Sequence, residues 1–241
     1  MSKQAVLNRK TKFNAETTKV VKWLMVKAAY LVTSAVVSGG TILGGLSPFG
    51  ASFCASVPYN ALPPSLIGSL VGYTFSSPAE SFRYMAVVMG IVGIRWVLKK
   101  KKIANTRIFP ALASFIPIAA TGVVLLTAGS ETLEGFTACM TEAIIASAAA
   151  YFFKQTLNSV RSKKAVTAWS STELAMLVIS GCILLLSVSS ISLNGFYPAR
   201  VLSILIILVF ARYGSVSGGC ICGTAFGMVF SLAQTGDFYI S

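Results

Sequence analysis

Long apolar stretches alternate with short basic segments along almost the whole chain. All but two of the 20 Lys and Arg residues lie at 3–27, 95–107, 154–164 and Arg212, and apolar residues fill the intervals. Connections rich in Lys and Arg stay on the cytoplasmic side of a bilayer, so pairs of apolar spans between these segments define a topology. The pattern predicts an all-α, polytopic integral membrane helical bundle with a cytoplasmic N-terminus.

Most of the spans follow directly from the apolar stretches. The expected spans cover residues 23–46, 83–98, 108–127, 133–153, 173–191, 197–211 and 214–233. A helix needs about 20 residues to cross a bilayer, and these stretches are close to that length. Residues 1–22 form a basic arm, which is either an amphipathic helix on the inner membrane surface or a disordered cytoplasmic segment. Residues 23–241 form one multi-span membrane domain.

Residues 47–76 do not fit one span, because prolines interrupt them at Pro48, Pro58, Pro63 and Pro64. The next span, 83–98, must end inside at its basic flank, so it begins outside, and 47–76 begin and end outside as well. These residues either cross twice as two short helices or enter and return as a re-entrant hairpin. We favour the first arrangement, which gives about nine spans; the second gives seven spans and a hairpin.

Composition excludes an ordinary soluble domain. The 241 residues are 55% hydrophobic and 11% charged, whereas soluble domains are roughly 25% charged. Anionic head groups beside the spans explain the net charge of +13, so the expected partner is membrane lipid and not nucleic acid. The five Cys lie in apolar segments and the chain has no His, so neither a zinc site nor a disulfide framework is indicated.

Glu142 is a carboxylate near the middle of a predicted span, where a charge costs roughly 2.5–3.5 kcal/mol. The candidate partners are Arg95, Arg200 and Arg212, each near the end of a span. A proton or cation pathway through Glu142 is one interpretation. The favoured interpretation is an internal ion pair or a protonated Glu142 hydrogen-bonded between helices.

A glycine stripe runs along the last predicted span. Its members allow helix backbones to touch, within the chain or between copies, and they are Gly214, Gly218, Gly219, Gly223 and Gly227. The sequence has no phosphate-binding loop, zinc motif or clustered carboxylates. We therefore expect no catalytic residue, no metal and no cofactor in this chain.

Four segments form a recognisable series. They are Leu46–Phe53, Thr141–Ala143 continuing to Tyr151–Phe153, Ser171–Leu174, and Ala211–Gly214 continuing through Gly218 and Gly219 to Ser231–Ala233. In order and spacing they resemble the N-terminal membrane domain of stage II sporulation protein E, over most of residues 24–240. The resemblance implies a ten-span anchor followed by a cytoplasmic oligomerisation region and a manganese-dependent Ser/Thr phosphatase domain.

The resemblance also implies a role in endospore-forming bacteria. Family members gather at the asymmetric division septum with the tubulin-like division protein. They dephosphorylate an anti-anti-sigma factor, which releases the first sigma factor of the forespore. The chain ends at Ser241, before a tenth span and the phosphatase, so we expect an anchor fragment. Its implied tasks are membrane anchoring, septal targeting and self-association, with septum proteins as partners; manganese is expected only in the absent phosphatase domain.

The alternative function is a small transporter or permease. The Pro-broken hairpin at 47–76 and Glu142 would then form a substrate or ion site, as discontinuous helices do in secondary transporters. An anchor and a transporter share this topology and differ in the role of Glu142.

Overall fold

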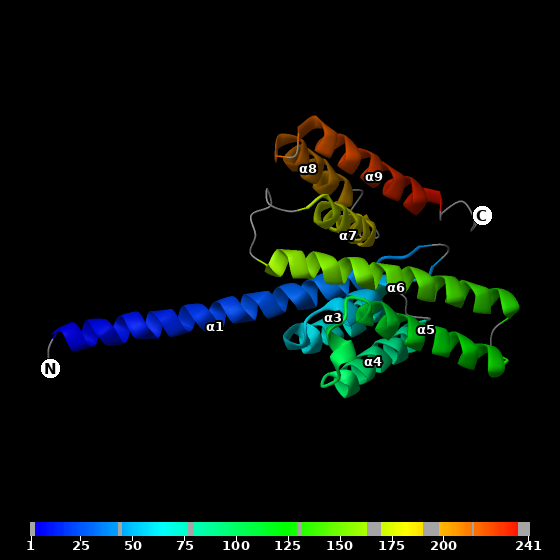
Figure 1. The fold of residues 1–241 in the computed structure, drawn as a ribbon, viewed down its shortest axis with the longest axis horizontal. Helices are drawn as coiled ribbons and strands as arrows, with labels where there is room; N and C mark the ends of the chain where they lie inside the picture. Colours follow the sequence, from blue (N-terminus) through cyan, green and yellow to red (C-terminus); the bar gives the residue numbers. More distant parts are fainter. Residues whose placement is uncertain are drawn as a thin grey trace.

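The described part of the chain is a bundle of helices (Figure 1). The computed structural model describes residues 3–42, 45–76, 80–129, 132–162, 170–189, 198–213 and 215–235. The helices are α1 (Lys3–Ser38), α2 (Phe49–Ser56), η1 (Tyr59–Ala61), α3 (Leu62–Ser76), α4 (Ser81–Leu98), η2 (Lys102–Asn105), α5 (Phe109–Thr127), α6 (Leu133–Arg161), α7 (Ser171–Ser189), α8 (Pro198–Tyr213) and α9 (Ser215–Thr235). The predicted all-α class is confirmed for these residues.

Five helices of the described residues are long and apolar enough to cross a membrane. They are α4, α5, α6, α7 and the Val20–Ser38 part of α1, while α9 contains a shorter apolar stretch, Gly219–Met228. Large apolar side chains on their outer surfaces, such as Trp23, Phe82 and Trp96, are more than half exposed. Such a surface suits lipid better than water. The nine spans and the cytoplasmic N-terminus stay predictions.

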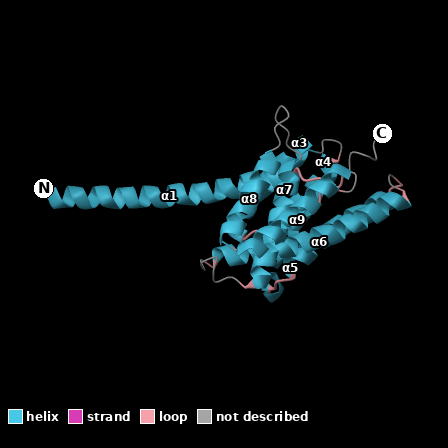
Figure 2. Ribbon diagram, turned by 90° about the horizontal axis from the view of Figure 1, so that it is seen from above, coloured by secondary structure: helices cyan, strands magenta, loops and turns pink. Residues whose placement is uncertain are grey.

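Helix α1 continues without a break from Lys3 to Ser38, so the basic arm predicted at 1–22 is helical from Lys3 and joins the first span. At 1.5 Å per residue its 36 residues extend about 54 Å. Its N-terminal half projects away from the other helices (Figures 1 and 2). The helix ends at Ser38, eight residues before the predicted end of the span at residue 46, and Gly39 and Gly40 close its last turn by hydrogen bonds to Val36 and Val37.

Helix α2 lies at the centre of the bundle. All eight of its residues are buried, and it packs against α1, α3, α4, α5 and α6. Its length of about 12 Å is too short for the roughly 30 Å hydrocarbon core of a bilayer. The prolines of 47–76 mark the starts of helices: Pro48 precedes α2, Pro58 precedes η1, and Pro63 and Pro64 lie in the first turn of α3.

Helix α3 runs parallel to α1 and in close contact with it. The Ser34 hydroxyl donates to the Ser65 carbonyl at 2.7 Å and lies 2.7 Å from the Ser69 hydroxyl. A Cβ atom at Gly68 would collide with the Leu31 carbonyl. One turn further along both helices, a Cβ atom at Gly72 would collide with the Ala35 carbonyl. Because α1 and α3 run in the same direction, α2 runs back between them, and residues 47–76 begin and end at one end of the bundle. That this end is the outer one, and that the segment crosses twice, stay predictions.

Replacing Gly68 by Ala tests this close contact. The added methyl group has to push α1 and α3 apart, so we expect the free energy of unfolding to fall by about 1–3 kcal/mol. Thermal unfolding of the detergent-solubilised chain, followed by circular dichroism, measures the change. Gly93→Ala on α4 is the matched control, because a Cβ atom there meets nothing within 4 Å. Equal effects of the two substitutions would contradict the proposed contact.

Candidate functional site

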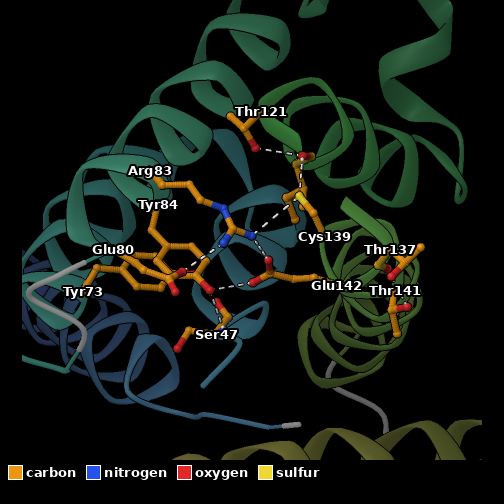
Figure 3. A network of polar contacts seen from close by, with 11 residues as sticks. Ser47, Tyr73, Glu80, Arg83, Tyr84, Thr121, Thr137, Cys139, Thr141 and Glu142 are labelled. Carbon is orange, nitrogen blue, oxygen red and sulfur yellow. Dashed lines mark hydrogen bonds and ion pairs between the residues drawn. The ribbon is translucent and has the colours of Figure 1, made fainter. Parts of the chain in front are cut away.

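A buried network of polar side chains surrounds the N-terminal end of α2 (Figure 3). Its centre is Glu142, which lies on α6 and is fully buried. Arg83 of α4 forms an ion pair with Glu142 Oε2 and a second one, of 2.9 Å, with Glu80. The Tyr84 hydroxyl donates to Glu142 Oε1 at 2.8 Å. Both carboxylate oxygens of Glu142 are therefore bound by protein groups.

Two stacked tyrosines connect this network to the backbone of α2. The rings of Tyr73 and Tyr84 lie 4.7 Å apart at an angle of 7°. The Ser47 amide donates to the Tyr84 hydroxyl at 2.9 Å, and the Tyr73 hydroxyl donates to the Ser47 carbonyl at 2.8 Å. The Ala51 amide donates to the Tyr73 hydroxyl at 2.9 Å. Tyr73 thus binds one of the first amides of α2, and both tyrosines bind the backbone of Ser47 just before the helix.

Arg95 binds the opposite end of α2. It is 3% exposed, and its guanidinium donates to the carbonyls of Cys54 and Val57 at 2.6 and 2.5 Å. The guanidinium also lies over the ring of Tyr59, 4.9 Å from its centroid. A cation at this position satisfies the last carbonyls of the helix and suits the negative end of the helix dipole.

Helix periodicity explains why α4 supplies side chains to both ends of α2. Its buried face carries Tyr84, Val87, Val88, Ile91 and Arg95, which repeat at three- and four-residue intervals. Arg95 comes eleven positions after Tyr84, which is about 16 Å along the helix and more than the length of α2. One face of α4 therefore reaches the whole of α2.

The partner of Glu142 differs from the ones expected. Arg83 fills this role, while Arg95 is at the other end of α2 and the exposed Arg200 and Arg212 lie on α8. Arg83 lies in the first turn of α4, and a long side chain at the end of a span can extend inward. The sequence does hold one sign of this role, because Arg83 lies outside every basic segment.

The glycine stripe makes only part of the expected contacts. Gly214 lies outside the described residues, and Gly218 is part of α9. A Cβ atom at Gly219 would lie 2.8 Å from the Ala211 Cβ atom, so this glycine allows α8 and α9 to approach closely. At Gly223 and Gly227 a Cβ atom would meet nothing within 4 Å. The last two positions therefore leave open surface along α9.

Chemically, the network is an ion pair enclosed by hydrogen bonds. The Arg83 guanidinium also lies 3.6 Å from Cys139 Sγ, which in turn donates to the Ile118 carbonyl at 3.4 Å. No group of three or more His, Cys, Asp or Glu residues suited to a metal ion occurs within the described residues. The arrangement joins α4, α5 and α6 to the start of α2.

Substitutions in the ion pair test its structural role. Arg83→Met leaves the fully buried Glu142 without its cation and is expected to cost about 3–5 kcal/mol of unfolding free energy. Glu142→Leu leaves Arg83 paired with Glu80 and is expected to cost less. The double variant buries neither charge and should lose clearly less than the sum of the single losses. Denaturant unfolding of the four proteins gives the coupling energy.

Arg107→Met provides the control, because Arg107 is exposed. We expect it to change the free energy of unfolding by no more than about 0.5 kcal/mol. If the double variant loses as much unfolding free energy as the two single variants together, Arg83 and Glu142 act independently and the proposed pairing is contradicted.

Comparison with known proteins assigns the family. A family model described as SpoIIE, N-terminal domain matches residues 1–240. No curated protein and no solved structure matches the chain. The match extends over nearly the full sequence, from α1 to beyond the end of α9, and confirms the family indicated by the four segments. The chain belongs to the SpoIIE N-terminal domain family.

Proposed function

We propose that this chain is the membrane anchor of a sporulation Ser/Thr phosphatase, and that it directs the protein to the division septum. The observation that carries the proposal is the family match over residues 1–240 on a bundle with five helices of spanning length. In this proposal the phosphatase is a separate cytoplasmic domain that holds its own manganese. Its activity releases the forespore sigma factor, and the anchor determines where that happens.

The proposed orientation places the N-terminus in the cytoplasm. The end of α3 lies beside the start of α4, where Tyr73 stacks on Tyr84, so α4 runs opposite to α3. Because α1 runs in the same direction as α3, α4 also runs opposite to α1. The exposed Lys99–Lys102 segment after α4 therefore lies at the same end as the basic N-terminal half of α1. Clustering of bases at one end supports a cytoplasmic location for that end. In this orientation a cytoplasmic phosphatase that follows the anchor requires an even number of spans in the complete anchor.

The buried network supports an anchor over a transporter. A transporter has to expose its substrate site to each side of the membrane in turn. Glu142 is fully buried, and its two oxygens are bound by Arg83 and Tyr84. A fixed cation and a stacked tyrosine occupy the positions that a proton or cation would need. The geometry therefore favours a structural role for Glu142.

Self-association is part of the proposal and uses α9. Gly223 and Gly227 are spaced by one helical turn, and a Cβ atom at either one meets none of the described residues within 4 Å. Close contact between helices in a membrane uses small residues at this spacing. A second copy that packs here would place two anchors, and two phosphatase domains, side by side.

The location of the chain in a sporulating cell tests the proposed function. A fluorescent protein is fused to its N-terminus and expressed in an endospore-forming bacterium during asymmetric division. We expect fluorescence to concentrate at the septum, because the membrane domain carries the targeting information. The Glu142→Gln variant is expected to concentrate there to the same extent, because the side chain has no transport task.

Two controls make the result interpretable. The fluorescent protein alone should fill the cytoplasm, and gel filtration in detergent should show that the Glu142→Gln fusion remains folded. Even fluorescence over the whole membrane would contradict septal targeting. Loss of the septal signal in a folded Glu142→Gln fusion would contradict a purely structural role for this residue.

A further inference from the structure

A groove of about 250 Å³ opens between α1, α6 and α7. Val26 and Ala29 of α1, Leu157 of α6 and Leu184 of α7 line it, together with the buried Phe53 of α2. The groove is smaller than the roughly 300–1,000 Å³ of pockets that enclose a drug-sized molecule. Its size and its apolar walls suit one segment of a chain-like apolar ligand.

Two of the polar side chains that line the groove, Thr156 and Ser180, are bound within the protein. The Thr156 hydroxyl donates to the Met176 carbonyl at 3.0 Å and lies 2.8 Å from the Ser180 hydroxyl. These contacts join α6 to α7 and leave little polar surface for a ligand. An occupant would therefore be held by apolar contact, as a lipid acyl chain is.

Basic side chains lie beyond one end of the groove. Lys22 is four residues before Val26 on α1, and Arg161 is four residues after Leu157 on α6, so each continues the groove-lining face of its helix. Because α6 runs opposite to α1, both bases are at the same end. Both side chains are exposed.

Further charges at this end keep it positive. Lys154 of α6 is half-buried and lies two helical turns before Arg161, on the same face of the helix. A carboxylate also lies at this end: Glu173, in the first turn of α7, accepts from the Ser170 amide at 2.9 Å and from Ser159 at 3.4 Å. Among the described residues at this end, the three bases Lys22, Lys154 and Arg161 therefore outnumber Glu173.

We propose that this groove binds an anionic phospholipid, with one acyl chain along the groove and the head-group phosphate between Lys22 and Arg161. The apolar walls take the chain, and the excess of cations selects an anionic head group over a zwitterionic one. Basic pockets between membrane helices recognise anionic head groups by the same electrostatics. This site is separate from the buried network at Glu142.

Native mass spectrometry of the full chain in detergent tests the proposal, with phosphatidylglycerol and phosphatidylcholine of identical acyl chains as the two probes. We expect phosphatidylglycerol to bind about tenfold more tightly than phosphatidylcholine. The double variant Lys22→Gln/Arg161→Gln should lose this preference. Ala29→Phe fills the groove from an exposed position and should weaken the binding of both lipids.

Matched substitutions outside the groove serve as controls. Lys100→Gln removes an exposed base from another connection, and Val32→Phe adds a ring to a position of α1 that is 58% exposed. Both should bind lipid as the unchanged chain does. The proposal is overturned if the unchanged chain retains no lipid or retains the two probes equally. It is also overturned if phosphatidylglycerol binding survives Ala29→Phe, since the cations alone would then hold a phosphate.

Discussion

A short helix buried from end to end is the constraint on which the rest of the structure depends. Both termini of α2 lie inside the bundle, where each unsatisfied backbone group costs several kcal/mol. Tyr73 and Tyr84 bind the backbone at its start, and Arg95 binds the carbonyls at its end. The helices that carry these side chains, α3 and α4, are thereby held against α2, and the close contact of α3 with α1 extends the same assembly.

Charges follow the direction of the α2 dipole. Tyr84 connects the Glu142 carboxylate to the positive N-terminal end of α2. The Arg95 guanidinium lies at the negative C-terminal end of the same helix. Arg83 compensates Glu142, so the buried carboxylate does not remain an isolated charge. Because this pair joins α4 to α6, it connects the outer helices to the central one. Such a closed network suits an anchor that keeps one arrangement better than a carrier that alternates between two.

The sequence predicts the helices better than their contacts. Apolar length locates α4 to α9, and prolines locate α2 and α3. The end of α1 is overestimated because Ile42 and Leu46 are also apolar, and composition alone does not show that they lie outside the helix. Arg83 and Glu142 are 59 residues apart, so their pairing depends on how α4 and α6 face each other. The close contact at Gly68 and Gly72 depends in the same way on the neighbour of α3, which no local pattern reveals.

Hydrogen exchange of the α2 backbone amides in the detergent-solubilised chain tests this account most directly. An isolated helix of eight residues is marginal in water, so slow exchange there requires burial and satisfied ends. We expect the amides of Phe49–Ser56 to exchange as slowly as those of the interior of α4. Exchange as fast as that of Lys100 and Arg107, in the exposed connection between α4 and α5, would contradict the central place given to α2.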